Sequence, residues 1–214
     1  MSVLTFDKNC KKCPRYVAFF KALRIEYPDY YNLPVPAFGD TNPELVIIGL
    51  APGMHGANAT GRPFTGDHAG IILYETLHKF GFSNQPQSSH KKDGLKLINC
   101  RITNAVKCLP PQNKPIGSEI NNCNAFLKAE IGKFKKNTVM IALGLVAHKA
   151  VIKAIGGKQS DFVFKHNTHY KIEPGHILID SYHCSRYNTN TKRLTEKMFH
   201  DVFRQAQKYI KKIK

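Results

Sequence analysis

Four short apolar runs mark the chain, and stretches with helical periodicity lie between and after them. Unbroken apolar runs rich in β-branched residues are typical of strands covered on both faces, as in a parallel sheet. The runs are residues 45–50, 101–106, 138–143 and 176–181. The helical stretches are residues 15–27, 71–80, 118–133, 146–155 and 191 onward. This alternation predicts an α/β fold with a parallel sheet and helices on both faces.

The remaining segments read as connections. Residues 30–43 are rich in Pro and Tyr and predict a surface crossing, while residues 83–94 are polar and predict a loop. Residues 161–171 alternate between polar and apolar positions, which indicates an antiparallel ribbon or an edge strand. No internal repeat or low-complexity linker divides the chain, so we expect one domain over residues 1–214.

A glycine-rich stretch, residues 49–70, follows the first predicted strand directly. In an open α/β sheet, ligands bind just past the carboxyl ends of the strands, and glycines let backbone N–H groups approach a ligand closely. No Gly-Lys-Ser/Thr closes the stretch, and its glycines do not follow G-x-G-x-x-G, so it matches neither a P-loop nor a dinucleotide fingerprint. A ligand site is therefore predicted here, and the polar and aromatic side chains available to it are Asn58, Arg62, Phe64, Asp67 and His68.

Charge narrows the class of partner. The sequence has 32 Lys and Arg against 15 Asp and Glu, a formal net charge of +17. Such an excess favours a polyanion, with DNA or RNA first, although a generally basic soluble surface is the alternative. No apolar run approaches the ~20 residues that span a bilayer, and the N-terminus has no apolar signal region. We expect no membrane association and a cytoplasmic location, nucleoid-associated in a prokaryote or nuclear in a eukaryote.

Four of the six cysteines suggest a metal site. Cys10 and Cys13 form a C-x-x-C pair, and fourteen residues separate Cys108 from Cys123. Four thiolates suit either tetrahedral zinc or an iron–sulfur cluster, and the spacing leaves both open. The alternative is four unrelated buried cysteines. Cys100 and Cys184 lie outside the pattern.

A second polar motif, residues 181–190, follows the fourth predicted strand. His183 at this strand end could face Asp67 across a cleft, or it could be held by a backbone carbonyl. Cys184 beside it suggests a cysteine nucleophile, but adjacent strand residues point to opposite faces, which argues against a Cys184–His183 pair.

Five separated elements together resemble the uracil-DNA glycosylases of the B type, the fifth family of that superfamily. They are CKKCPR, PVPAFGD, GLAPGMHGANATGRPFTGD, TNAVKCLPPQNKP and HCSRYNTNTKRLT, and they cover the chain from Cys10 to about Thr195. The resemblance implies a three-layer α/β/α fold with a four-stranded parallel sheet, and a [4Fe–4S] cluster on Cys10, Cys13, Cys108 and Cys123. The second motif usually reads His-Pro-Ser, and Cys184 in place of the proline puts the rigidity of that loop in question.

The activity implied is hydrolysis of the N-glycosidic bond of an extruded uracil in DNA. By this resemblance Asp67 positions water and supports the sugar cation, and His183 donates a hydrogen bond to the uracil O2. Phe64 is expected to stack on the base, and Asn113, or else Asn104, to read its edge. The full set of expected substrate-binding residues is Gly49, Leu50, Ala51, Gly53, Phe64, Asn104, Asn113, Ser185 and Asn188.

Two alternatives accompany this interpretation. The first is an A-type-like glycosylase, or one that removes a broader range of deaminated bases. Leu50 stands where the related A type usually carries an acidic residue, and an apolar wall there fits the broader range. A non-catalytic iron–sulfur protein that binds nucleic acid would explain the charge and the cysteines but would leave Asp67 and His183 without a role. No lysine suggests itself as a Schiff-base nucleophile, so a monofunctional enzyme that leaves an abasic site is expected. Nothing demands more than a monomer acting on DNA that contains uracil or another deaminated base.

Overall fold

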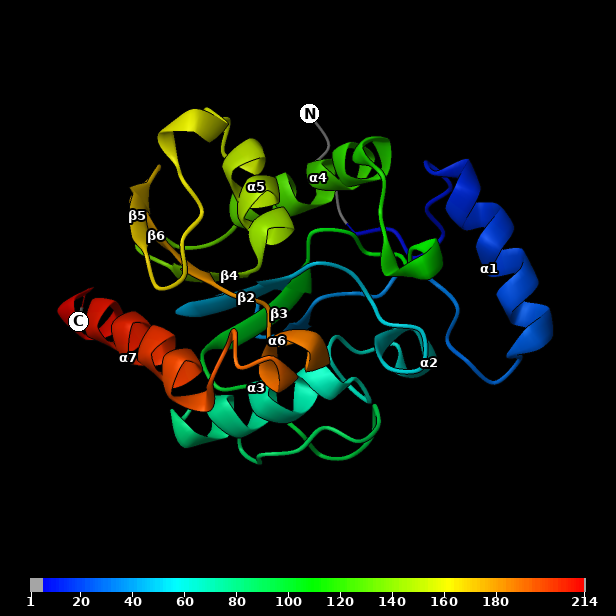
Figure 1. The fold of residues 1–214 in the computed structure, drawn as a ribbon. Coiled ribbons are helices and arrows are strands. Elements are labelled where there is room, and N and C mark those ends of the chain that lie inside the picture. The colour runs from blue at the N-terminus through cyan, green and yellow to red at the C-terminus, as the bar shows by residue number, and fades with distance from the viewer. Residues whose placement is uncertain (1–5, 214) are drawn as a thin grey trace.

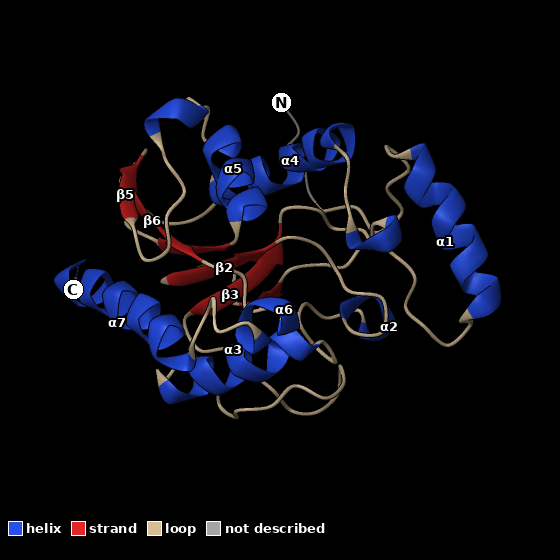
Figure 2. Ribbon diagram, viewed as in Figure 1, coloured by secondary structure: helices blue, strands red, loops and turns tan. Residues whose placement is uncertain are grey.

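A six-stranded mixed sheet forms the centre of the molecule in the computed structural model, which describes residues 6–213 (Figures 1 and 2). The strand order is β1-β3-β2-β4-β6-β5. The strands are β1 (Phe38–Gly39), β2 (Leu45–Gly49), β3 (Cys100–Asn104), β4 (Val139–Leu143), β5 (His169–Ile172) and β6 (His176–Ser181). The inner four run parallel, while β1 and β5 pair antiparallel at the two edges.

Four of the helices form two layers on the faces of the sheet, and one stands apart from both layers (Figure 1). The helices are α1 (Pro14–Glu26), α2 (Ala57–Thr60), α3 (His68–Lys79), α4 (Gly117–Ile131), α5 (Leu145–Ala154), α6 (Arg186–Asn190) and α7 (Glu196–Ile213). In Figure 1, α4 and α5 cover one face of the sheet and α3 and α7 the other, whereas α1 stands to one side. Within residues 6–213, no helix is both long and apolar enough to cross a membrane.

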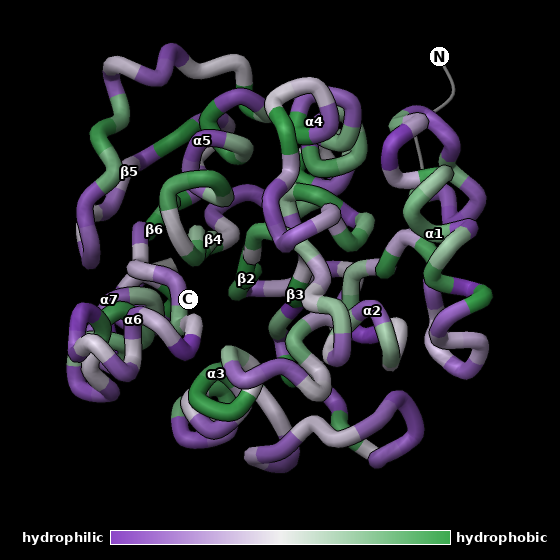
Figure 3. Tube along the Cα trace, turned by 45° about the vertical axis from the view of Figure 1, so that its right-hand side comes forward, coloured by the Kyte–Doolittle hydropathy of each residue, from purple (hydrophilic) through white to green (hydrophobic). Residues whose placement is uncertain are grey.

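Alternate residues of the central strands supply two separate cores. Ile47 and Ile141 pack with Phe203 of α7 on one face, whereas Val46 and Met140 pack with residues of α4 and α5 on the other. The two faces explain why these strands are apolar at successive positions rather than at every second one. The green, hydrophobic parts of the trace accordingly gather on the central strands and on α3 (Figure 3).

The four central strands confirm the predicted parallel sheet, but the expected count of four strands was wrong. The edge strand β1 has only two residues, paired with Ile102 and Arg101, and lies inside the segment predicted as a surface crossing. Two residues are too few to show a periodicity, so the pattern missed it. The edge position of β5 agrees with the alternation seen in residues 161–171.

The helix expected from residue 191 onward was also wrong in its start. The chain forms α6 first, and α7 begins only at Glu196. Ser185 begins α6 because its hydroxyl accepts the backbone N–H of Asn188 at 3.4 Å. The second motif therefore lies on a short helix of its own.

The parallel pairing places four strand ends at one edge of the sheet. Gly49 at the end of β2 is in register with Asn104 at the end of β3, and Leu143 of β4 with Ser181 of β6. The glycine-rich stretch and the second motif both leave from this edge. Ligands of open α/β sheets bind at such an edge, which directs attention to it.

A buried ion pair fixes the polar loop of residues 83–94 against the glycine-rich stretch. Arg62 Nη1 donates to Asp93 Oδ1 at 3.0 Å, and Arg62 Nη2 bonds the second carboxylate oxygen. The same guanidinium donates to Ser88 Oγ and to the carbonyl of His90 at 2.6 and 2.8 Å. Both charged side chains are buried, at 4% and 6% exposure. The Arg62 side chain therefore anchors the loop through Ser88, His90 and Asp93.

Asp93→Asn is expected to lower the free energy of unfolding by about 3–5 kcal/mol, because it leaves the Arg62 charge buried without a carboxylate. Urea unfolding followed by circular dichroism measures this. The exposed Asp29 offers a matched control, since Asp29→Asn removes a charge that has no such partner.

The wild-type pair also has a defined pH dependence. Burial by itself would raise the pKa of Asp93, but hydrogen bonds from Arg62 and from the backbone N–H groups of Leu95 and Ser89 hold it well below its usual range. Since the folded-state pKa is depressed, the stabilisation is complete above pH ~4 and is lost as the pH falls through the folded-state value. The difference between wild type and Asp93→Asn should thus shrink in acid, and a difference that stays constant would contradict this assignment.

Candidate active site

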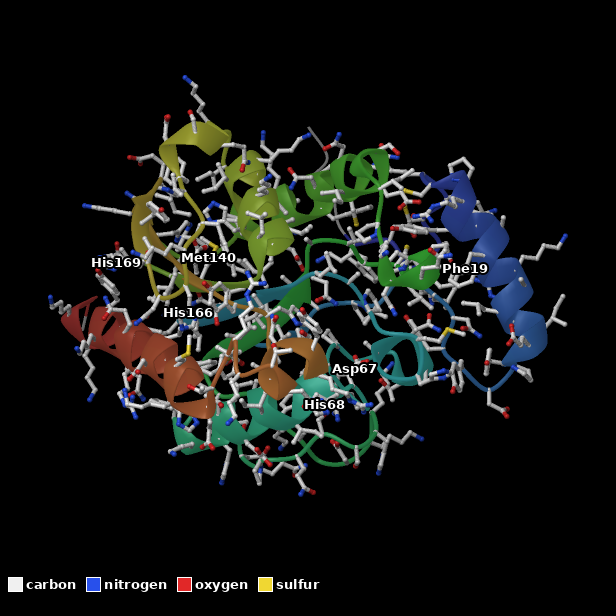
Figure 4. The ribbon with its side chains drawn as sticks, in the orientation of Figure 1. Phe19, Asp67, His68, Met140, His166 and His169 are labelled. Atoms are coloured by element: carbon white, nitrogen blue, oxygen red, sulfur yellow. The ribbon has the colours of Figure 1, made fainter. Side chains whose placement is uncertain are left out.

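A cleft opens at the carboxyl ends of the parallel strands and brings the two polar motifs together. Its empty volume is about 1070 Å³. Most of the predicted substrate residues line it, namely Leu50, Ala51, Gly53, Phe64, Asp67, Asn113, His183 and Ser185. Three predicted residues, Gly49, Asn104 and Asn188, do not line it and lie directly behind its walls, as described below. Figure 4 labels Asp67 and His68 where the glycine-rich stretch enters α3.

The carboxylate of Asp67 is held against the main chain of the glycine-rich stretch. Asp67 Oδ2 accepts the backbone N–H of Ala57 at 3.1 Å. Burial raises the pKa of Asp67, and the Ala57 hydrogen bond offsets part of that effect. A Cβ atom added to Gly53 or Gly56 would overlap Asp67 Oδ1. These two glycines are therefore required by the carboxylate itself, since any side chain there would displace it.

Phe64 and His183 face each other across the cleft from the two motifs. Their ring centroids lie 6.2 Å apart with an interplanar angle of 25°. Phe64 has a positive φ of 58°, and a Cβ on Gly70 would overlap its carbonyl oxygen. A left-handed conformation is unusual for an aromatic residue and persists only where the surroundings enforce it. The α3 residue Gly70 makes room for that backbone.

The imidazole of His183 is neutral, and its Nδ1 makes no hydrogen bond within residues 6–213. Desolvation lowers the pKa of His183 to about 4. The Nδ1 atom is buried. The alternative of a histidine held by a backbone carbonyl through this nitrogen is therefore not what the structure shows. A neutral imidazole keeps one N–H donor and one acceptor, so the ring can still donate to a ligand.

The loop after β6 is fastened through its main chain and through Cys184. Asn188 Nδ2 donates to the carbonyl of His183 at 2.8 Å, which explains why the Asn188 side chain lies behind the wall. Cys184 is fully buried, and its Sγ donates to the carbonyl of Ala69 in α3 at 3.4 Å. This bond joins the second motif to the helix that follows Asp67. It supplies a constraint at the position where the resemblance has a proline.

The two candidate asparagines occupy different places. Asn113 is exposed on the cleft wall, in a short 3-10 turn at residues 111–113. Asn104 is buried, and its Oδ1 has no hydrogen-bond partner within residues 6–213. A Cβ on Gly49 would overlap Asn104 Oδ1 and lie 2.7 Å from Cζ of Phe64. Asn104 thus sits behind Gly49 and Phe64, and Asn113 faces the opening.

Several lining residues had no individual role predicted from the sequence, although all but Pro110 lie in the glycine-rich stretch or in the second motif. They are Pro52, Met54, His55, Gly56, Gly66, Ala69, Pro110 and Arg186. His55 is exposed, and its Nδ1 lies 2.9 Å from the hydroxyl of Tyr30 in a segment distant in sequence. Arg186 lies within the second motif, directly after Ser185, and this position was the available clue.

The four patterned cysteines line a second, apolar pocket. Its empty volume is about 470 Å³, and Tyr16, Phe20 and Phe126 contribute aromatic walls. Burial raises the pKa of Cys108 and Cys123, and the neighbouring cysteines raise both further. The remaining two cysteines, at positions 100 and 184, are buried elsewhere in the core.

Two hydrogen bonds reach the sulfurs of this pocket. Asn122 Nδ2 lies 3.6 Å from Cys13 Sγ and donates to the carbonyl of Lys12 at 3.1 Å. The backbone N–H of Lys107 donates to Cys123 Sγ at 3.2 Å. Among residues 6–213, no group of three or more His, Cys, Asp or Glu side chains is arranged to hold a single metal ion. The four thiols share one apolar pocket.

Comparison with known proteins identifies similar chains. The family model described as the uracil DNA glycosylase superfamily matches residues 36–207. A type-5 uracil-DNA glycosylase of Thermus thermophilus is 42% identical over 206 residues, covering 93% of each chain. One of Pyrobaculum aerophilum is 39% identical, covering 92% of this chain and 88% of its own. A type-4 uracil-DNA glycosylase of the same organism is 34% identical over 150 residues, which is 70% of this chain and 62% of that one.

A solved structure shares the fold. The crystal structure of wild-type SMUG2 from Pedobacter heparinus superposes with a TM-score of 0.50 at 14% identity, covering 94% of this chain and 86% of that one. At that identity the likeness concerns the arrangement of helices and strands alone.

Gly56→Ala is expected to lower the free energy of unfolding by about 1–3 kcal/mol, because the new methyl group overlaps the Asp67 carboxylate. Thermal unfolding measures the change. Gly117→Ala is the matched control: Gly117 begins α4, and a Cβ there meets nothing within 4 Å. That variant should be as stable as wild type or slightly more so, since alanine favours a helix. Equal effects of the two substitutions would contradict the close approach at Asp67.

Proposed function

Because the chain belongs to the uracil DNA glycosylase superfamily, we propose that it removes uracil from DNA in base excision repair by hydrolysing the N-glycosidic bond. The observation that supports the residue roles is the cleft in which Asp67 and His183, from distant motifs, line one space beside Phe64. The net charge of +17 suits a protein that must bind phosphates. The enzyme leaves an abasic site.

The target base must leave the duplex before its bond can be broken. Extrusion costs a few kcal/mol, which contacts in the pocket must offset. Phe64 stacks on the base, and backbone N–H groups of residues 49–53 hold its oxygens, since glycines permit the approach. Asn113, exposed on the cleft wall, reads the polar edge. Asn104 is the second candidate for this role, because its buried amide oxygen has no other partner among the described residues.

Bond cleavage builds negative charge on the departing base, which His183 is placed to stabilise. With its pKa lowered to about 4, the imidazole is neutral at physiological pH and donates one N–H toward the uracil O2. A fixed donor in a desolvated site is worth more than the same donor in water. Ser185 and Asn188 hold the loop that carries it.

The sugar gains positive charge in the same step, and Asp67 is the group that supports it. Its carboxylate is anchored by Ala57 and faces the cleft, so it orients a water molecule for attack on the sugar carbon. By analogy with glycoside hydrolysis, the water approaches from the face opposite the leaving base.

The lining residues support a hydrolase without lyase activity. No lysine is among the described residues that line the cleft, so no side chain there can form a Schiff base with the sugar. Leu50 gives the cleft an apolar wall, which favours a second activity on other deaminated bases such as hypoxanthine or xanthine.

We also propose a [4Fe–4S] cluster on Cys10, Cys13, Cys108 and Cys123. The four thiols, the apolar walls and the two hydrogen bonds to sulfur fit such a group. When bound, the cluster would supply four covalent links that join the N-terminal segment to the loop after β3 and to α4. Its role here is structural. The chain's own contribution is an apolar pocket with Tyr16 and Phe20 of α1 among its walls.

Asp67→Asn is expected to reduce the rate of base release by ~10²–10⁴-fold, because the amide cannot serve as the base that orients water. DNA affinity should change by less than ~3-fold, since the carboxylate faces the reacting sugar. The assay is strand scission after alkali on a fluorescent duplex with one U opposite G, using anaerobically purified protein. The control is the exposed Asp161→Asn, which should cleave as wild type does.

Scission only after alkali supports base removal without lyase activity, and a hypoxanthine duplex tests the broader range. A wild-type protein that binds both duplexes and yields no abasic product would instead be a non-catalytic DNA-binding protein.

Cys108→Ser is expected to lose bound iron and to unfold at a temperature lower by several degrees, because one cluster ligand is removed. Iron content and the absorbance near 400 nm report on the cluster, and calorimetry reports on stability. Cys100→Ala is the control, since that cysteine is buried in β3 outside the pocket. A Cys108→Ser protein that keeps its iron and its brown colour would disprove this ligand assignment.

A further inference from the structure

Three side chains hold the main chain around His183 and leave its ring free. The backbone N–H of Tyr182 donates to Nδ1 of His166 at 3.1 Å. The carbonyl of His183 accepts from Asn188, and the Sγ of Cys184 donates to Ala69 in α3. The imidazole of His183 itself has no partner at Nδ1 among the described residues. The direction of the His183 ring is therefore set by the three contacts that hold the backbone of residues 182–184.

Of these three side chains, His166 lies farthest from His183 in the sequence. It contacts Tyr182 both through the hydrogen bond and through its ring. It lies in the segment before β5, and its ring stacks on that of Tyr182 with centroids 4.9 Å apart and an angle of 18°. The backbone of Met198 in α7 lies close enough to affect the pKa of His166. His166, labelled in Figure 4, thus contacts the second motif from a segment outside it.

The contact with Tyr182 requires a neutral ring. A backbone N–H only donates, so Nδ1 of His166 must carry the lone pair. Protonation at Nδ1 would place two donors face to face and break the bond to Tyr182. Burial lowers the pKa of His166, while the nearby backbone of Met198 and the charge of Asp201 oppose that shift.

The charged groups around His166 come from three elements. Asp201 of α7 is the acid that acts on it, and it is itself paired with Lys197 and Arg204. The Arg193 guanidinium lies over the Tyr182 ring at 4.8 Å. On its own segment, Lys165 and His169 are exposed, and His169 contacts Tyr209 and Gln205 instead. The one acid that acts on the ring is thus shared with two cations.

We propose that His166 is a positioning residue for His183: its neutral Nδ1 fixes the main chain of Tyr182 and so aims the His183 imidazole into the cleft. This inference rests on the proposed function, in which His183 donates to the departing base. Its physical basis is that a displacement of about 1 Å at a catalytic group can cost ~10²-fold in rate. Nothing in the sequence marks His166, because its partner is a backbone N–H.

Two substitutions at this position separate positioning from mere stability. His166→Ala removes the acceptor and is expected to lower kcat for base release by ~10-fold or more with KM nearly unchanged. His166→Gln keeps an oxygen acceptor and should restore most of kcat. The control is His169→Gln in β5, three residues away, whose ring contacts Tyr209 and Gln205 of α7; this variant should behave as wild type. Thermal unfolding of each variant shows whether it is folded, and His166→Gln keeps the test valid if His166→Ala is not.

The pH profile is a second readout. In wild type, kcat should fall as the pH drops through the pKa of His166, because the protonated ring releases Tyr182. An amide does not titrate, so the ratio of His166→Gln activity to wild-type activity should rise in acid. Equal profiles for the two proteins, or a kcat of His166→Ala equal to wild type, would overturn the proposal.

A measurement without catalysis keeps this inference distinct from the proposed function. The amide resonance of Tyr182, followed by NMR, should shift with the protonation of His166 in wild type and lose that titration in His166→Gln. If the wild type releases no base, the proposed function fails while this titration still reports the contact. If base is released but the Tyr182 amide does not respond to pH, the function stands and the positioning role of His166 is wrong.

Discussion

Four parallel strands end in register at one edge of the sheet, and every group proposed to act on the substrate is placed from that edge. The pairing of Gly49 with Asn104 and of Leu143 with Ser181 fixes where each connecting segment starts. A shift of one residue in either pairing would turn the strand's side chains to the opposite face and carry the loops with them. The register of the strands therefore fixes where the cleft forms, and the side chains of the connecting segments line it.

Desolvation acts in opposite directions on the two groups that matter most. It raises the pKa of Asp67 and lowers that of His183, and both shifts favour the neutral form. For His183 the outcome suits the role proposed for it, since a neutral donor next to a leaving base needs no counter-ion. For Asp67 the hydrogen bond from Ala57 counteracts burial and helps to keep the carboxylate ionised. Perturbed groups in a cleft are the usual mark of a functional site.

The cleft and the cysteine pocket are connected through one segment of the chain. From the end of β3, residues 105–113 carry Cys108 on the cysteine pocket and Asn113 on the cleft wall. Between the strand and these sites, the buried ammonium of Lys107 bonds Glu130 of α4 at 2.7 Å, which fixes the start of the segment. The proposed cluster, by securing Cys108, would therefore also secure the cleft wall that carries Asn113.

The sequence by itself determined the four central strands, the site at the glycine-rich stretch and the grouping of four cysteines. Each of these has a local signature: an unbroken apolar run, a cluster of glycines after a strand, or a fixed spacing of thiols. Only the tertiary structure decided that β1 extends the sheet, that Asn113 rather than Asn104 faces the opening, and that Cys184 bonds Ala69. It also decided that Arg62 anchors the loop through Asp93 and that His166 grips Tyr182. These contacts join residues far apart in sequence, often through a backbone N–H or carbonyl group. Because nearly every residue has these groups, no pattern of residue types predicts such contacts.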